Sequence, residues 1–146
     1  MRILLADDSS LILERLNNMV SLNEHVEIVA QLKNGKDALE ALRILKPDLA
    51  ILDIKMPGLS GLYVLNEIRK ENKSIIIIIL TLYSSDYYRQ LAIQFGTNYF
   101  FSKVDDFEKV SLIVAQLSEN DEKSQKGTNN LNWHARWQLI KRQKII

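Results

Sequence analysis

The chain has 146 residues, of which 47% are hydrophobic, and a formal net charge of +1. This length allows one domain with a real hydrophobic core and a short appendage, but leaves little room for a second domain. The absence of cysteine excludes disulfides, thiolate nucleophiles and cysteine-based zinc sites, and the longest apolar run, 75–80, is far too short to span a bilayer, so we expect a soluble, cytoplasmic protein.

Apolar runs of strand length alternate with segments of helical periodicity over the first 118 residues. The runs are, in chain order, 3–6, 26–32, 49–52, 75–80 and 98–101. Because most of them are continuous rather than alternating, we expect strands buried on both faces, as in a parallel sheet covered by helices. The segments between them, such as 38–45 and 62–68, place apolar residues at a spacing near 3.6. Five such units predict an α/β fold: a doubly wound, five-stranded parallel sheet of flavodoxin-like order 2-1-3-4-5, with helices on both faces.

Three acidic residues directly follow two of the predicted strands. Asp7 and Asp8 come after the first strand, and Asp53 comes after the third. The carboxyl ends of strands in an open α/β sheet meet at one edge, so these carboxylates can converge there. Like charges at short range repel one another unless a cation shares them, and oxygen ligands with room for water and phosphate suit Mg²⁺. The sequence therefore predicts a metal-assisted phosphate site with Mg²⁺ as its cofactor.

The fourth and fifth predicted strands are also followed by polar residues, among them Thr81 and Lys103. Together these motifs resemble, over residues 1–118, the receiver domains of bacterial two-component response regulators, and more closely those that stand alone. The family has the fold predicted above. The resemblance implies that Asp7 and Asp8 are the acidic metal-binding pair, Asp53 in LDIKMPGLSG the phosphorylated aspartate, Thr81 the switch hydroxyl, Lys103 in NYFFSK the phosphate-binding lysine and Phe100 the rotating aromatic.

The chemistry of these side chains agrees with such roles. A carboxylate can attack a phosphoryl group and form an aspartyl phosphate, and Asp53 is the candidate nucleophile. Catalysis of phosphoryl transfer is mostly positioning and charge stabilisation. We expect Mg²⁺ to be held by Asp8, Asp53 and the backbone carbonyl of Lys55, with Asp7 acting directly or through water. Lys103 would supply a second positive charge as a phosphate ligand.

Each of these residues alone also has an ordinary structural explanation. Asp7 and Asp8 could cap the first helix, Asp53 could belong to a turn, and Lys103 could be a solvated surface lysine. Polar residues that follow four different strands at the same edge favour a phosphoacceptor. The expected function is that of a signalling switch, which catalyses only its own phosphorylation and dephosphorylation and is not an enzyme for other substrates.

Two alternatives come from other functional classes. One is an aspartate-nucleophile phosphatase of the haloacid dehalogenase type, which would also use Asp53. That class has an aspartate two residues after the nucleophile, where this chain has Lys55. The other alternative is a nucleic-acid or membrane binder that acts through the basic C-terminal tail.

The composition changes after residue 118. The segment 119–130 contains no apolar residue and predicts a polar linker. Residues 131–146 form a basic, aromatic tail with two tryptophans, four basic residues and no acidic residue. The tail is too short to be an independent domain, and it could add an edge strand, form an interfacial helix or stay disordered. We favour docking on another protein, and the alternatives are weak membrane association and an extension without a function.

Two positions depart from the family pattern. The residue after the switch threonine is commonly small, whereas Leu82 follows Thr81 here and would narrow the access to Asp53. The phosphate-binding lysine is commonly followed by proline in a cis peptide, whereas Val104 follows Lys103. A trans bond is expected, because a cis bond before a residue other than proline costs about 3 kcal/mol. The placement of Lys103 could change as a result.

The resemblance also implies partners. The phosphoryl donor would be a sensor histidine kinase or a phosphotransfer protein, and the output would be another protein of unknown identity. We expect neither nucleic-acid binding by the receiver domain nor membrane association. In this family the face of the fourth helix, fifth strand and fifth helix usually carries the output, and a homodimer could form through it. Aromatic residues, which favour interfaces, gather in this part of the chain, and the alternative is that several of them belong to the core. They are Tyr83, Tyr87, Tyr88, Phe95, Tyr99, Phe100 and Phe101.

Overall fold

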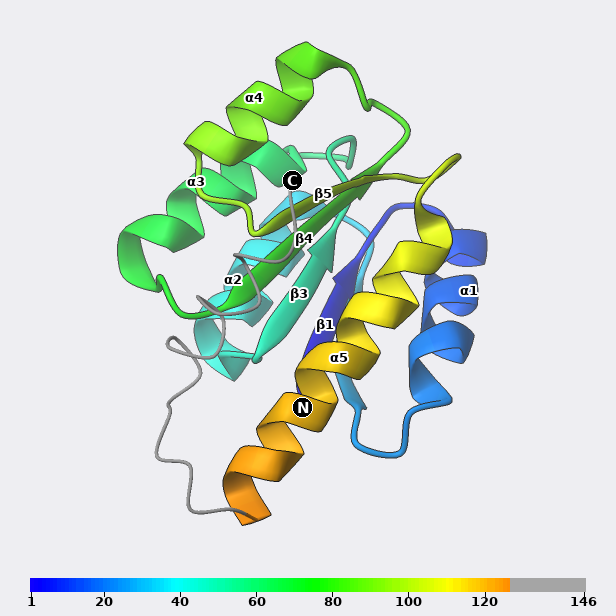
Figure 1. Cartoon of the computed structure of the whole chain (residues 1–146). Coiled ribbons are helices and arrows are strands. Elements are labelled where there is room, and N and C mark those ends of the chain that lie inside the picture. The colour runs from blue at the N-terminus through cyan, green and yellow to red at the C-terminus, as the bar shows by residue number, and fades with distance from the viewer. Residues whose placement is uncertain (127–146) are drawn as a thin grey trace.

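Five parallel strands form one sheet at the centre of the protein (Figure 1), in a computed structural model that describes residues 1–126. The strands are β1 (Arg2–Ala6), β2 (Glu27–Leu32), β3 (Leu49–Leu52), β4 (Ile76–Thr81) and β5 (Tyr99–Ser102). Their order in the sheet is β2-β1-β3-β4-β5, and every neighbouring pair is parallel. The predicted doubly wound α/β fold and its strand order are confirmed.

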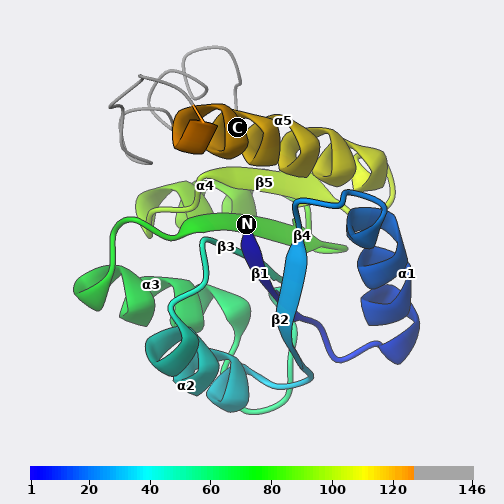
Figure 2. The same ribbon diagram turned by 90° about the horizontal axis from the view of Figure 1, so that it is seen from below.

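Helices cover both faces of the sheet. They are α1 (Ser10–Ser21), α2 (Gly35–Leu45), α3 (Gly61–Glu71), α4 (Asp86–Gln94) and α5 (Phe107–Lys126). Helices α1 and α5 pack on one face, and α2 and α3 pack on the other, with α4 beside β5 (Figure 2). Successive side chains of β1 alternate between the two cores: Ile3 and Leu5 face α1 and α5, whereas Leu4 and Ala6 face α2 and α3. The central strands are therefore buried on both sides, which explains their continuous apolar sequences.

Side-chain caps determine where three helices begin. The side-chain oxygen of Ser9 accepts a hydrogen bond from the N–H of Ile12 at the start of α1. Asn34 accepts in the same way from the N–H of Asp37 at the start of α2, and Ser60 caps α3. Such caps satisfy backbone donors that have no partner within the helix. Each of these helices therefore starts at a defined residue close to the carboxyl edge of the sheet.

Backbone hydrogen bonds continue past the ends of the strands at this edge. The N–H groups of Asp7, Asp53 and Lys103 donate to the carbonyls of Leu32, Ala6 and Thr81, at 3.0, 3.0 and 2.9 Å. The strands end in register, because Ala6 is paired with Leu52 and Thr81 with Ser102. The residues that follow β1, β3 and β5 are thus fixed at this edge by main-chain bonds.

The ends of some elements differ from the sequence prediction. Strands β4 and β5 each begin and end one residue later than predicted, so Thr81 belongs to β4. Residues 119–126 of the predicted polar linker continue α5 as far as Lys126, and the division of the chain into receiver, linker and tail stays a prediction. This stretch contains neither glycine nor proline before Gly127, and its Glu, Lys and Gln residues favour a helix even without an apolar stripe.

Residues 127–130 of the predicted linker and the tail 131–146 lie outside the described residues. The predicted character of the tail therefore stays a prediction. None of the helices within residues 1–126 has the length and apolarity that a membrane span requires.

Candidate functional site

Lys103 bridges two aspartates at the carboxyl edge of the sheet. Its Nζ lies 2.6 Å from Oδ2 of Asp7 and donates a hydrogen bond to Oδ2 of Asp53 at 3.0 Å. The three side chains are buried, with 8%, 3% and 7% of their surface exposed. In such a buried group the removal of the lysine charge leaves both carboxylates uncompensated. Residues that follow β1, β3 and β5 are thus brought together, as predicted from the sequence.

Asp8 completes the acidic cluster. One carboxylate oxygen from each of Asp7, Asp8 and Asp53 lies within 4.8 Å of the other two. Asp7 and Asp53 are buried and Asp8 is exposed, so the cluster is reached from solvent. Three carboxylates that offer only oxygen ligands fit a hard cation such as Mg²⁺, which keeps several of its waters. One lysine cannot neutralise three carboxylates, whereas a divalent cation would supply the missing charge. The carbonyl of Lys55 as a further ligand stays a prediction.

Burial and ion pairing act in opposite directions on the titration of the site. Burial raises the pKa of Asp53, the hydrogen bond and charge of Lys103 lower it, and the net result is a pKa above the ordinary value of an aspartate. For Lys103, burial lowers the pKa, but the hydrogen bonds and charges of Asp7 and Asp53 outweigh burial and raise it. Lys103 therefore stays an ammonium ion, and the Asp53 carboxylate is more basic than an exposed one.

Backbone contacts position Asp53. Its Oδ1 accepts a hydrogen bond from the N–H of Ile54 at 2.8 Å, while Oδ2 contacts Lys103. Gly61, the first residue of α3, packs so closely that an added Cβ would lie 1.8 Å from the carbonyl oxygen of Asp53. The N–H of Gly61 also donates to the carbonyl of Ile54 at 2.8 Å. Sequence analysis missed this role of Gly61, whose only signal is its position at the end of LDIKMPGLSG.

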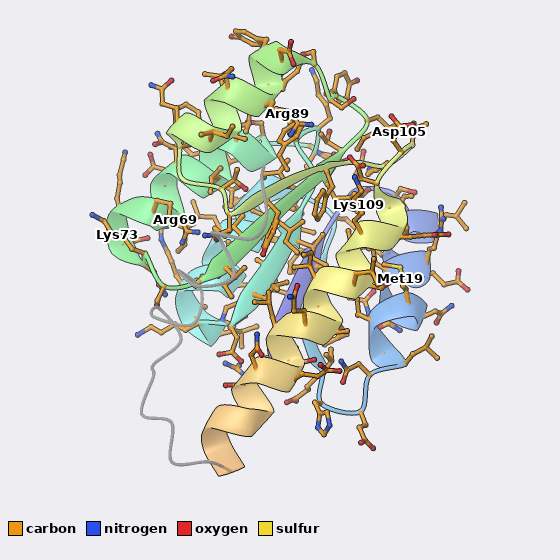
Figure 3. The ribbon with its side chains drawn as sticks, in the orientation of Figure 1. Met19, Arg69, Lys73, Arg89, Asp105 and Lys109 are labelled. Atoms are coloured by element: carbon orange, nitrogen blue, oxygen red, sulfur yellow. The ribbon has the colours of Figure 1, made fainter. Side chains whose placement is uncertain are left out.

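The two predicted switch residues are buried. Thr81 ends β4, and its Oγ1 accepts a hydrogen bond from the N–H of Tyr83 at 3.0 Å, which ties the hydroxyl to the loop before α4. Phe100 on β5 is 1% exposed, and the guanidinium of Arg89 on α4 lies 4.8 Å from the centre of its ring (Figure 3). A cation over an aromatic face is attractive. Arg89, which the sequence did not single out, therefore links α4 to the buried ring.

The loops after β3 and β4 bring Lys55 and Tyr83 together. The Nζ of Lys55 lies 5.2 Å from the ring centre of Tyr83, and the rings of Tyr83 and Tyr88 meet edge to face at 5.8 Å. Lys55 is exposed, and Tyr83 is 44% exposed. Lys55 follows Asp53 by two residues and Tyr83 follows Thr81 by two. The pair therefore joins the two loops that leave the site.

The structure divides the predicted aromatic cluster between the core and the surface. Tyr99, Phe100 and Phe101 lie in the core, where at most 9% of each residue is exposed. Tyr83 and Tyr87 are exposed, and Tyr87 packs edge to face on Tyr88, with their ring centres 5.3 Å apart. The aromatic surface is thus smaller than predicted and is formed by α4 and the loop before it.

Val104 does not prevent Lys103 from reaching the site. No peptide bond among the described residues is cis, so the bond between Lys103 and Val104 is trans, as predicted. The N–H of Val104 donates to the side-chain oxygen of Ser102 at 3.1 Å, and 76% of Val104 is exposed. Lys103 nevertheless contacts both Asp7 and Asp53.

Comparison with known proteins identifies a family. The chain matches the response regulator receiver domain over residues 3–115. It is 33% identical over 110 residues to the DNA-binding transcriptional activator EvgA of Escherichia coli, an alignment that covers 75% of this chain and 53% of EvgA. It is 34% identical over 108 residues to the uncharacterized transcriptional regulatory protein YvfU of Bacillus subtilis, covering 72% of this chain and 54% of YvfU. The chain thus spans about half the length of these curated relatives.

Solved structures of response regulators share the fold. The receiver domain of AraT, a response regulator from Geobacillus stearothermophilus, is 29% identical with a TM-score of 0.73, and the match covers 85% of this chain and 97% of that chain. A DNA-binding response regulator of the LuxR family from Staphylococcus aureus is 31% identical with a TM-score of 0.70, covering 80% and 98%. Nothing in these comparisons favours the haloacid dehalogenase alternative. This chain belongs to the response regulator receiver domains, the signalling switches of two-component systems.

Proposed function

We propose that this receiver takes a phosphoryl group onto Asp53 from a phosphohistidine of a sensor histidine kinase or phosphotransfer protein. The observation that carries the proposal is the buried contact of Lys103 with both Asp7 and Asp53, with an oxygen of Asp8 in the same cluster. This arrangement supplies a carboxylate nucleophile, a fixed positive charge and oxygen ligands for a metal ion at one place.

In the transfer, a carboxylate oxygen of Asp53 attacks phosphorus, and the bond between phosphorus and the donor's imidazole nitrogen breaks. The imidazole, protonated on its other nitrogen, leaves as a neutral histidine. Lys103 is already within hydrogen-bond distance of Asp53, so it can follow the developing charge onto the phosphoryl oxygens. Mg²⁺, held by Asp7, Asp8, Asp53 and the carbonyl of Lys55, would neutralise those oxygens when bound.

Thr81 would report the phosphoryl group to the rest of the protein. A hydroxyl has one hydrogen to donate and two lone pairs, so Thr81 can donate to a phosphoryl oxygen and still accept from the N–H of Tyr83. Movement of Thr81 toward the phosphate would therefore pull the start of the loop before α4. That loop carries the exposed ring of Tyr83, and α4 carries Arg89 over Phe100. The switch would thus change the surface of α4 and β5.

The output of this switch would be the binding of another protein in the cytoplasm. Tyr83 and Tyr87, at 44% and 68% exposed, give this surface aromatic side chains of the kind that interfaces favour. A homodimer through the face of α4, β5 and α5 is a second form that this output could take. The name of EvgA describes that protein as DNA-binding, but we propose no binding of nucleic acid or membranes by this receiver domain. We also propose no enzymatic activity beyond its own phosphorylation and dephosphorylation.

Intact-mass measurement tests the proposal. Acetyl phosphate with Mg²⁺ should add one phosphoryl group to the wild type and none to Asp53→Asn, and a chelator should prevent the addition. Asp105→Asn, which removes an exposed aspartate after β5, is the matched control and should be labelled like the wild type. Equal labelling of Asp53→Asn and the wild type would overturn the assignment.

A further inference from the structure

Helices α1 and α5 lie side by side on one face of the sheet (Figures 1 and 2). Their side chains line a groove between the two helices. It consists of two hollows of about 630 and 700 Å³ that share the side chains of Met19, Leu22, Ser111 and Leu112. Figure 3 labels Met19 on α1, beside α5. Both hollows are open to solvent, so together they form a surface groove rather than an enclosed pocket. None of the residues that line the groove belongs to the acidic cluster.

The walls of the groove expose large apolar side chains. Leu22, which follows α1, is 88% exposed, and Leu112 on α5 is 68% exposed. Met19 contributes a partly buried side chain between them. Exposed apolar side chains on both walls of a groove are typical of a surface that another segment covers.

Acidic side chains outnumber basic ones around the groove. Glu24, Glu108 and Glu119 line it and are exposed. Among the described residues that line the groove, Arg15 is the one lysine or arginine, and its guanidinium lies 3.8 Å from the ring centre of Phe107. The groove therefore favours an occupant that is both apolar and positively charged.

We propose that residues 131–146 of this same chain occupy the groove. This segment has four basic residues and no acidic residue, which complements the acidic rim. It also contains Trp133 and Trp137, which at a spacing of four would lie on one side of a helix, and Ile140 would extend that side. Tryptophan is the side chain most suited to anchor a segment in a hydrophobic pocket.

The segment can reach the groove. Glu119 marks one end of the groove. Helix α5 continues for seven residues to Lys126, so it ends about 10 Å beyond the groove. Residues 127–130 can span about 13 Å when extended, which is enough for the chain to turn back to Glu119. From Glu119 to Glu108 the groove follows α5 for about 16 Å, and a helix of sixteen residues is about 24 Å long.

Tryptophan fluorescence tests the proposal directly, because both tryptophans of the chain lie in this segment. In the full chain, tryptophan emission should lie at shorter wavelength than in a synthetic peptide of residues 127–146. It should also be protected from quenching by acrylamide, relative to that peptide. Leu22→Asp combined with Leu112→Asp should remove the protection, since both sites are exposed and tolerate polar residues without unfolding. Ile44→Asp on α2, where 71% of the residue is exposed, is the matched control and should leave the protection intact.

Charge reversal gives a second, independent test. Glu24→Lys combined with Glu119→Lys should weaken the protection, whereas Glu40→Lys, at an exposed position on α2, should not. The proposal is overturned if the full chain is quenched as readily as the peptide, or if the control variants lose as much protection as the groove variants. If protection from quenching grows with protein concentration, the groove is occupied by the segment of a second copy of the chain. Protection that requires vesicles of anionic lipid would assign the tail to a membrane. Either result would overturn docking within one chain.

Discussion

The ammonium group of Lys103 lies closer to Asp7 than to Asp53, at 2.6 Å against 3.0 Å. Asp7 also accepts a hydrogen bond from the N–H of Ser9 at 2.9 Å, so the carboxylate that anchors the lysine is itself held in place. Lys103 can therefore keep one ion contact while Asp53 gains or loses a phosphoryl group. The position of Lys103 is therefore set by Asp7 as well as by the phosphoacceptor Asp53.

Lys103→Met should destabilise the protein. The variant keeps most of the apolar stem but leaves Asp7 and Asp53 without their buried positive charge, which should cost roughly 3 kcal/mol in the free energy of unfolding. Urea unfolding in the absence of divalent cations measures this loss, and added Mg²⁺ should restore part of it. Lys109→Met removes a pair with Asp106 in which the lysine is exposed, and it should cost less than about 1 kcal/mol. Equal losses in the two variants would contradict this account.

Asp53→Asn should be more stable than the wild type at neutral pH. The pKa of Asp53 is raised in the folded state, so the wild type loses stability as pH rises from the ordinary value of 3.8 through the folded pKa. The asparagine variant does not lose this stability, because its side chain does not ionise. Its advantage should be absent below that window, where Asp53 is protonated in both states, and should reach its full size above it. Thermal unfolding across pH measures the difference, and an advantage that stayed constant at acidic pH would refute the electrostatic explanation.

Gly61→Ala should weaken both the fold and the phosphorylation reaction. The new Cβ would lie 1.8 Å from the carbonyl oxygen of Asp53, so α3 or the acceptor must move, at a cost of about 1–3 kcal/mol. Gly58→Asn is the control, because nothing lies within 4 Å of a Cβ there and asparagine tolerates the positive φ of 78°. Unfolding free energies and labelling by acetyl phosphate should separate the two variants. Wild-type labelling of Gly61→Ala would show that close packing of α3 is not needed.

The phosphorylated state should be long-lived. Hydrolysis requires a water in line with the phosphoryl group, and the contact between Lys55 and Tyr83 joins the two loops that such a water must pass. Displacing that water by an ångström can slow a reaction about a hundredfold. Loss of phosphate from purified, donor-free protein should therefore be faster in Lys55→Asn and in Tyr83→Ala.

Tyr63→Ala is the control for the decay measurement. Tyr63 is also about half exposed, but it lies on α3 and not in the loop that carries Tyr83. This variant should lose phosphate at the wild-type rate. Decay within seconds in the wild type, or unchanged decay in Lys55→Asn and Tyr83→Ala, would count against shielding of the acceptor.

The sequence predicts most of the site because each polar residue lies at or just past the end of a continuous apolar strand. Once the sheet is parallel and its strands follow the order β2-β1-β3-β4-β5, Asp7, Asp53 and Lys103 come together at one edge. Gly61 could not be recognised in the same way. Its importance depends on which backbone atom packs against it, and that is set by the approach of α3 to Asp53.

The remaining differences come from composition. For Tyr99 and Phe101, aromatic composition left both an interface and the core open, and β5 places both rings in the core under α1 and α5, with Phe100 on its other face. The polar segment after residue 118 was predicted to be a linker because it lacks apolar residues. Helix propensity continues α5 to Lys126 nonetheless, because an established helix adds residues more easily than a new helix forms.

The N–H groups of Asp7, Asp53 and Lys103 hold the backbone of this edge by hydrogen bonds to carbonyls of neighbouring strands. None of these bonds uses a side chain, so a substitution at any of the three positions leaves the backbone scaffold with its hydrogen bonds. A chain that had lost its acceptor or its lysine could still present the same edge and the same arrangement of helices. A protein can therefore share this fold without being able to accept a phosphoryl group, because that ability depends on the side chains at these three positions.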